Sequence, residues 1–210
     1  MKYDIKGIHV YFRENPGIFV FMILVIFAGI ACGALLVRFI DDGPLTEITT
    51  SLNHFFNTLK EDEGNLLAAP ELLRASFSKN GTIFLLLWEL GMFSVGYFLV
   101  LPVLFLKGIS LGFTVGVLIY RYSIKGVLFC LAALLPHNLF LVPAYILGAA
   151  FTFTYSFYLF RNRFTRGKTE HTFLPQYCLY MSLVILLALM GGLVEAYITP
   201  VFMRLVMPII

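Results

Sequence analysis

The chain has 210 residues, of which 60% are apolar and 13% are charged, and its formal net charge is +3. Soluble domains have roughly 45–50% apolar and about 25% charged residues, so this composition excludes an ordinary soluble domain and predicts an all-α polytopic membrane helix bundle. No basic patch is interleaved with exposed aromatic residues in the way that a nucleic-acid surface requires, so we expect no nucleic-acid partner.

The polar start of the chain is followed by the first predicted membrane span. Residues 1–15 are expected to form a cytoplasmic tail, and residues 16–210 a single transmembrane domain. Pro16 opens the apolar run Gly17–Val37, and proline is favourable at a first helical position because its missing N–H would have no partner there. The run is longer than the apolar core of a cleaved signal peptide, which has about 7–15 residues. We therefore expect a retained span.

Residues 38–81 form the one sizeable polar stretch and are expected to lie outside the cell membrane. After Pro44, apolar residues recur at helical spacing. They are Leu45, Ile48, Leu52, Phe55, Phe56 and Leu59. Amphipathic helices of this kind lie in the membrane interface or dock against a partner, so this face is a candidate partner-binding surface. The alternative is that the same helix only caps the bundle.

Two further runs are predicted to cross the membrane. The second span is Thr82–Phe105, and Lys107-Gly108 is expected to end it. The third run, Ile109–Tyr120, has only 12 residues, so it can cross only with help from bilayer thinning or from tilted neighbours.

Glycines recur at every fourth position in two places. They are Gly29 and Gly33 in the first span, and Gly108, Gly112 and Gly116 along the third run. This spacing allows the backbone of another helix to approach closely, so we expect these glycines to be helix-packing positions. Either set is also a candidate face for a homodimer.

The next apolar stretch is too long for one crossing. A helix over Lys125–Phe160 would reach about 50 Å, against a hydrocarbon core of roughly 30 Å. Proline removes a backbone donor and disfavours a helical conformation at the residue before it, so Leu135-Pro136-His137-Asn138 is predicted to break the helix. We expect a half-helix over Gly126–Leu134, then a full crossing that ends at Phe160. A last span at Tyr177–Ile198 brings the prediction to about five transmembrane helices and one half-helix.

The orientation is predicted from the lysines and arginines between the spans. Eight of them lie on the side of the amino terminus and seven on the other side. The dense group over Arg161–Lys168 lies in a short connection, where positive charge has most influence. We therefore expect the amino terminus inside the cell and the carboxyl terminus outside.

Polar residues within the apolar runs are the candidates for a site, because ionisable groups inside a bilayer are costly. The candidates are Glu89, Pro136, His137, Asn138, Pro143 and Glu195. One hypothesis is that Glu89 and His137 meet at a broken helix, as polar groups do in transporters. The other is that His137 and Asn138 satisfy carbonyl groups freed by Pro136, while the two glutamates hold helices together.

Two motifs of known enzymes do not occur. The sequence contains no His-Glu-x-x-His zinc pair and no Gly-x-x-x-x-Gly-Lys phosphate loop. The three cysteines, Cys32, Cys130 and Cys178, lie within apolar runs and have no metal-like or redox-like spacing. We expect no catalytic residue, no metal and no cofactor.

Four segments resemble those of a known family. They are Asn80-Gly81-Thr82-Ile83, the stretch Lys107–Gly116, the break Leu135-Pro136-His137-Asn138 with Val142-Pro143-Ala144, and the ending Glu195-Ala196-Tyr197-Ile198-Thr199-Pro200. In this order, and over nearly the whole chain, they resemble stage II sporulation protein M. The broader family commonly has glycine and glutamate where this chain has Asn138 and Leu141, which looks more like the sporulation branch. The absent carboxylate at Leu141 weakens any transport chemistry taken from that broader family.

The resemblance implies a role without catalysis. The family protein is thought to be a scaffold in the mother-cell membrane of spore-forming bacteria, at the septum and engulfing membrane. The implied partners are the lipid bilayer and stage II sporulation proteins P and D, which are peptidoglycan hydrolases that remodel the wall during engulfment. A permease-like transporter that uses Glu89 and His137 is the alternative function.

Overall fold

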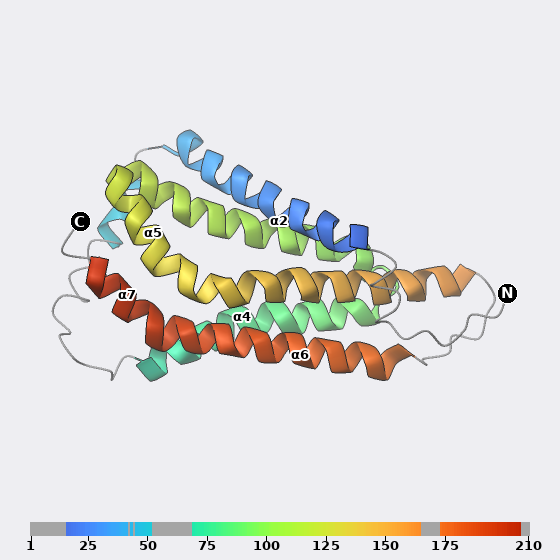
Figure 1. The fold of residues 1–210 in the computed structure, drawn as a ribbon. Coiled ribbons are helices and arrows are strands. Elements are labelled where there is room, and N and C mark those ends of the chain that lie inside the picture. The colour runs from blue at the N-terminus through green and yellow to red at the C-terminus, as the bar shows by residue number, and fades with distance from the viewer. Residues whose placement is uncertain (1–15, 42, 44, 52–68, 165–172, 207–210) are drawn as a thin grey trace.

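A computed structural model describes residues 16–41, 43, 45–51, 69–164 and 173–206. Its regular elements are α2 (Pro16–Leu36), the 3-10 turn η1 (Val37–Phe39), α4 (Ala69–Met92), α5 (Gly96–Phe164), α6 (Leu174–Leu193), the π-helical turn η4 (Val194–Ile198) and α7 (Thr199–Val206). A further short helix covers residues 45–51. Figure 1 shows the long helices side by side in an elongated bundle. For these residues the predicted all-α architecture is confirmed.

Three helical stretches in the described ranges are long and apolar enough to cross a membrane. They are Pro16–Phe39, Gly96–Arg163 and Leu174–Val206. The second stretch has 68 residues, which is far more than the roughly 20 that one crossing needs. α4 has 24 residues but is more polar than these three.

The longest helix, α5, is folded back on itself at Ser123. This residue has φ 50° and ψ −128°, and it is the non-glycine residue with positive φ in the described chain. Residues 96–122 and 124–164 form two arms that pack together. Their backbones approach so closely near Ser123 that a Cβ on Gly126 would overlap the carbonyl oxygen of Leu118. Figure 1 shows the two arms running in opposite directions, from green to orange. We call them the first and second arms of α5.

The predicted break at Pro136 is therefore wrong. Pro136 and Pro143 both lie inside the continuous second arm, and the interruption is at Ser123 instead. The arm curves in its first half, as Figure 1 shows, which is the usual result of a proline that removes one helical hydrogen bond. The predicted end at Lys107-Gly108 is also wrong, because the first arm runs through both residues.

The predicted span Thr82–Phe105 is divided between two elements. A tight turn at residues 93–95 joins α4 to the first arm, where Gly96 N–H donates to the Phe93 carbonyl at 3.0 Å. Ser156 Oγ from the second arm donates to the same carbonyl at 2.5 Å and accepts from Tyr97 N–H at 2.7 Å. We call this end of the bundle the turn end, and the opposite one the Ser123 end. The chain thus makes a helical hairpin at each end.

The glycines lie where α2 meets the first arm of α5. A Cβ built on Gly29 would lie 3.1 Å from the Cα of Gly108, and one on Gly33 would lie 2.8 Å from the backbone nitrogen of Phe113. A Cβ on Gly112 would overlap the carbonyl of Ile30. Since rising numbers on one helix match rising numbers on the other, the two helices run parallel. A dimer through either glycine set would have to break this contact.

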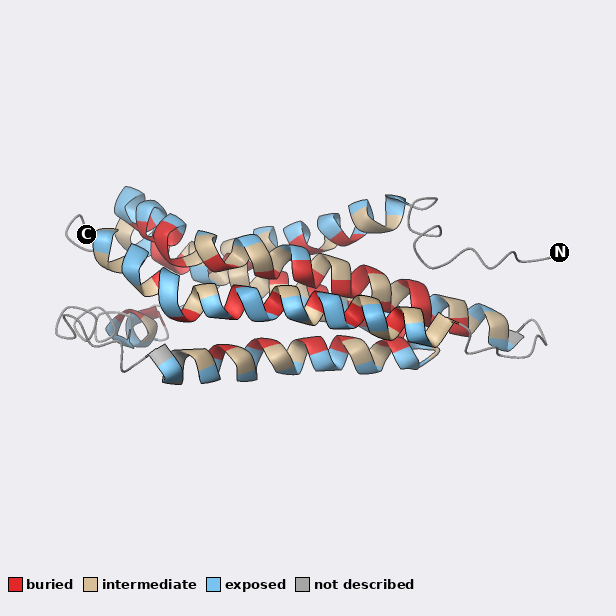
Figure 2. Ribbon diagram, turned by 60° about the horizontal axis from the view of Figure 1, so that its bottom comes forward, coloured by how far each residue is buried: buried red, intermediate tan, exposed pale blue. Residues whose placement is uncertain are grey.

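The core of the bundle is apolar and aromatic. Fully buried side chains include Phe84, Leu87 and Tyr145, and the rings of Phe84 and Tyr145 stack at 4.6 Å. Figure 2 shows buried positions on the sides of the long helices that face one another and exposed positions on the outer sides. Many exposed side chains are large and apolar, Leu24 and Phe27 of α2 among them. This is the surface expected of helices that face lipid.

Candidate functional site

The side chain of Asn80 in α4 connects four helices. Its amide oxygen accepts from the hydroxyl of Tyr145 at 2.7 Å and from Lys107 Nζ at 3.3 Å, so both arms of α5 contact it. Its amide nitrogen donates to Ser76 Oγ and to Glu195 Oε2, each at 3.2 Å. Ser76 Oγ also donates to Glu195 Oε2 at 2.5 Å. We call these five residues the Asn80 cluster.

The cluster lies near the middle of the bundle's length. At 1.5 Å per residue, Lys107 is about 17 Å along the first arm from Gly96 at the turn end, or half of a hydrocarbon core of roughly 30 Å. Its neighbour Gly108 packs against Ile26 and Gly29, near the middle of α2. The Lys107 ammonium lies 4.7 Å from the centroid of the Tyr145 ring, a cation–π contact. A lysine at this depth is costly, so the ring, the amide and the carboxylate of Glu195 together make it tolerable.

A π-helical turn brings Glu195 into the cluster. In η4 the backbone N–H of Thr199 bonds to the carbonyl of Val194, and Thr199 Oγ1 donates to the same oxygen at 3.2 Å. Single π-helical turns within α-helices occur often at functional sites, because the extra residue redirects the side chains that follow. Glu195 and Thr199 are the polar residues that this turn presents to the neighbouring helices.

His137 forms a second polar group beside the Asn80 cluster. Its Nδ1 lies 3.3 Å from Thr199 Oγ1, and its Nε2 lies 3.2 Å from Asn138 Nδ2. Because the Thr199 hydroxyl already donates to a carbonyl, Nδ1 must donate to it, and Nε2 accepts from Asn138. The pattern is that of a neutral imidazole. Thr199, the partner of His137, closes the π-helical turn that contains Glu195.

Glu89 does not meet His137, and the predicted pairing of these two residues is wrong. Thr152 donates to the carbonyl of Leu87 at 2.8 Å, which places that part of α4 at the level of Thr152. Thr152 is about 22 Å along the second arm from His137. Glu89 is exposed on the outer side of α4. The carboxylate near His137 is that of Glu195.

Sequence analysis missed Ser76, Asn80, Lys107 and Tyr145 as site residues. Lys107 was interpreted as the end of a span, although a lysine between two long apolar runs is a signal that it lies within one. Asn80 belongs to the stretch 38–81 that was expected outside the membrane, whereas α4 buries it in the bundle. Tyr145 gave no signal, because single tyrosines are common in membrane helices.

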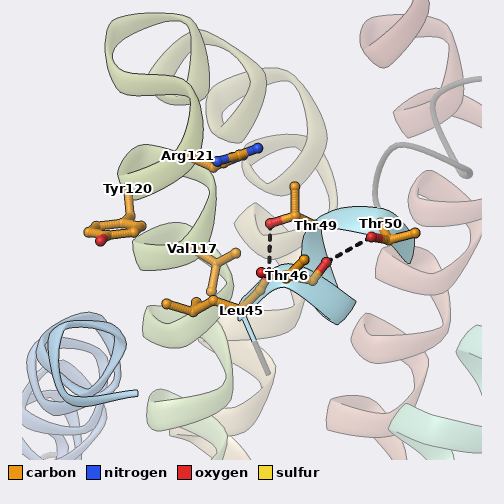
Figure 3. A pocket seen from close by; sticks show the side chains of 7 residues that line it. All are labelled: Leu45, Thr46, Thr49, Thr50, Val117, Tyr120 and Arg121. Carbon is orange, nitrogen blue, oxygen red and sulfur yellow. Dashed lines mark hydrogen bonds between the residues drawn. The ribbon is translucent and has the colours of Figure 1, made fainter. Parts of the chain in front are cut away.

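The predicted partner face is only partly described. Leu45 is buried against Val37 and Val117, and Ile48 packs against the same group, so both contribute to the bundle itself. Leu52, Phe55, Phe56 and Leu59 lie outside the described residues. Beside Leu45 is a pocket of about 230 Å³ near the Ser123 end, shown in Figure 3. Its lining consists of Leu45, Thr46, Thr49, Thr50, Val117, Tyr120 and Arg121.

Two hydroxyls of this pocket, those of Thr49 and Thr50, are engaged with their own helix. Thr49 Oγ1 donates to the carbonyl of Leu45 at 2.7 Å, and Thr50 Oγ1 to that of Thr46 at 2.9 Å, as the dashed lines in Figure 3 show. The pocket therefore offers hydroxyl acceptors and the exposed Arg121. Within the described residues, no group of three or more His, Cys, Asp or Glu side chains is placed to hold a metal ion.

Each of the four segments on which the family resemblance rests supplies a polar residue to this region. They supply Asn80, Lys107, His137 with Asn138, and Glu195 with Thr199. The family model for stage II sporulation protein M matches residues 22–200. The chain belongs to the stage II sporulation protein M family. Neither the curated proteins nor the solved structures include a match to it. As a member of the stage II sporulation protein M family, it is a sporulation-related membrane protein.

Proposed function

We propose that the chain is a non-catalytic membrane scaffold that anchors peptidoglycan-degrading enzymes for septal wall remodelling during engulfment. The enzymes proposed are stage II sporulation proteins P and D. The scaffold sits in the mother-cell membrane, with its amino terminus in the cytoplasm and its carboxyl terminus outside. Membership of the stage II sporulation protein M family supports a role in sporulation at a membrane.

The observation that carries the proposal is how the Asn80 cluster uses its hydrogen-bonding groups. Both atoms of the Asn80 amide are engaged twice, and the Ser76, Tyr145 and Glu195 side chains all bond within the cluster. Buried polar networks whose members are satisfied make a structure rigid and specify one arrangement. A rigid bundle is what a protein needs if it holds enzymes in place rather than moves a substrate.

The proposal is tested by affinity purification of the tagged full chain in mild detergent from sporulating cells. We expect stage II sporulation proteins P and D to be recovered, and a multi-pass membrane protein with the same tag to recover neither. Leu52→Glu and Phe56→Glu test the predicted amphipathic face, and loss of both enzymes would locate the contact there. Recovery of the chain without either enzyme would contradict the scaffold.

A second candidate is a permease-like transporter, favoured by a lysine and a carboxylate at mid-depth beside a π-helical turn. The site would then be Lys107, Asn80 and Glu195 with His137, and not Glu89. Proteoliposomes that contain a pH-sensitive dye would test it. A permease requires a proton flux that Glu195→Gln removes, whereas a scaffold shows no flux above empty liposomes.

A further inference from the structure

The outer side of α4 carries a stripe of exposed residues with alternating spacings of three and four. The stripe consists of Ala75, Ser78, Thr82, Leu85, Glu89 and Met92, all exposed. Ser76, Asn80 and Phe84 point the opposite way, into the bundle. In Figure 2 α4 is the lowest helix, with buried positions above and exposed positions below. We call this stripe the α4 seam. Its spacing is that of helices that pack side by side over a long distance.

The seam differs from the surfaces that suit lipid. On α2 the exposed side chains include Phe21, Leu24 and Phe27, which are apolar. The seam instead begins with Ala75, Ser78 and Thr82, whose small size allows another helix to approach closely. Thr82 Oγ1 donates to the carbonyl of Ser78 at 2.7 Å and so is compatible with an apolar neighbour.

Glu89 is the residue of the seam that lipid covers least well. It lies about 5 Å, or one helical turn, inside α4 from its end at Met92. Its carboxylate makes no hydrogen bond or ion pair with any residue that the structure describes. A carboxylate at this depth is stabilised by a hydrogen-bond donor or a positive charge, and the residues that the structure describes supply neither to Glu89.

Charge decides between two occupants of the seam. Two copies of the chain in one membrane have the same orientation, so a two-fold contact through this stripe would place α4 parallel to α4. Glu89 would then face Glu89, and like charges in direct opposition are destabilising. A different protein whose helix presents a lysine or arginine at this level would neutralise Glu89 instead.

We propose that the α4 seam binds one membrane-spanning helix of a partner protein, which presents a lysine or arginine to Glu89 and small or apolar side chains to the rest. The inference rests on the proposed scaffold and deepens it, because it places a contact with the anchored enzyme inside the membrane. Specific pairing then comes from one charge pair and close packing along the small residues.

Site-specific photo-crosslinking tests the seam in intact membranes. A photoreactive amino acid is placed at Thr82 on the seam, or at Leu24 on the exposed face of α2 as a matched control, in the full chain. Each form is co-expressed with full-length stage II sporulation protein P or D. We expect a crosslink to the membrane segment of one enzyme from Thr82, at least about tenfold stronger than from Leu24. Glu89→Lys in the Thr82 form should weaken it at least tenfold, and reversal of the partner's charge should restore it.

The outcomes separate the seam from the scaffold. Crosslinking of Thr82 to a second copy of the chain, or equal yields from Thr82 and Leu24, would overturn the seam. Recovery of an enzyme in detergent without any crosslink from Thr82 would overturn the seam and leave the scaffold standing. Failure to recover either enzyme with the unaltered chain would overturn both. If Glu89→Lys does not fold, the comparison of crosslink yields from Thr82 and Leu24 alone tests the seam.

Discussion

At Asn80 a single amide group joins a lysine and a glutamate that make no direct ion pair with each other. Its oxygen faces the ammonium of Lys107 and its nitrogen faces the carboxylate of Glu195. An amide can do this because it has an acceptor at one end and donors at the other. The two opposite charges then sit within the same small region, although they lie 88 positions apart in the chain.

The contributions of Lys107 and Glu195 to the free energy of unfolding should therefore depend on each other. Lys107→Met or Glu195→Gln alone should lower the free energy of unfolding by about 3 kcal/mol, because each leaves the opposite charge uncompensated in a buried site. The double variant should lose clearly less than the sum of the two single losses. Thermal unfolding in detergent measures all four proteins, and additive losses would show that the two charges are independent.

Asn80 should contribute more to the free energy of unfolding than Thr82, a polar residue on the same helix. Asn80→Ala removes four hydrogen bonds and leaves Lys107, Tyr145 and Glu195 without their common partner, so we expect a loss of about 3 kcal/mol in the free energy of unfolding. Thr82→Ala is the matched control, since Thr82 is exposed and bonds only to its own helix, and should change it by less than about 0.5 kcal/mol. Equal effects of the two changes would refute the role of Asn80 as the hub.

Sequence analysis predicted part of this site. Glu195 and His137 were candidates because an ionisable residue in an apolar run has a cost that needs a reason. The partner of His137 was wrong, since nothing in a linear sequence shows that Glu89 and His137 are about 22 Å apart. Asn80 was missed because its importance comes from three long-range contacts and from no local pattern.

At the scale of elements, the packing of α2 on the first arm of α5 depends on glycine. Gly112→Leu would force its side chain into the backbone of Ile30, so we expect a loss of more than about 3 kcal/mol in the free energy of unfolding. Gly17→Leu, at the start of the partner helix α2, is the control, because no atom lies within 4 Å of a Cβ there. Similar melting temperatures for the two variants would show that this helix pair is not in close contact.

The fold-back at Ser123 gives a second test at this scale. A serine at φ 50° is strained, and glycine adopts positive φ at little cost, so Ser123→Gly should raise the free energy of unfolding by about 1 kcal/mol. Ser110→Gly, in an exposed helical position of the first arm, should lower it by about 0.5 kcal/mol. Chemical denaturation of both variants measures the two shifts. A shift of the same sign in both would contradict the fold-back at Ser123.

The elements show where periodicity is informative and where it is not. Apolar runs correctly indicated helices. The glycine spacing indicated a close contact with another helix, and α2 makes that contact with the first arm of α5. The breaks were misplaced because a proline inside a long helix bends it without ending it. The true interruptions, at residues 93–95 and at Ser123, depend on tertiary contacts such as the Ser156 hydrogen bonds that no local pattern reveals.

At the scale of the whole molecule, α2, α4, the two arms of α5 and the α6–α7 stretch form one bundle with a polar cluster at mid-depth. Four of these parts face lipid with apolar side chains, whereas α4 exposes the seam. The bundle thus has a rigid interior and one outer face suited to another helix. This combination is the physical basis of the proposed scaffold.

Engulfment in cells that carry only the Lys107→Met/Glu195→Gln double variant separates a scaffold from a transporter. The double variant removes both charges from mid-depth and leaves the Thr82 and Glu89 seam untouched. If the chain is a scaffold, cells with normal amounts of this variant should still complete engulfment, because Asn80 keeps its bonds with Ser76 and Tyr145 and the amide oxygen introduced by Glu195→Gln can still accept from Asn80. Fluorescence microscopy of the mother-cell membrane measures engulfment. Arrested engulfment, with the variant present at the normal level and both hydrolases still bound to it, would contradict the scaffold and show that the charges at mid-depth act in transport.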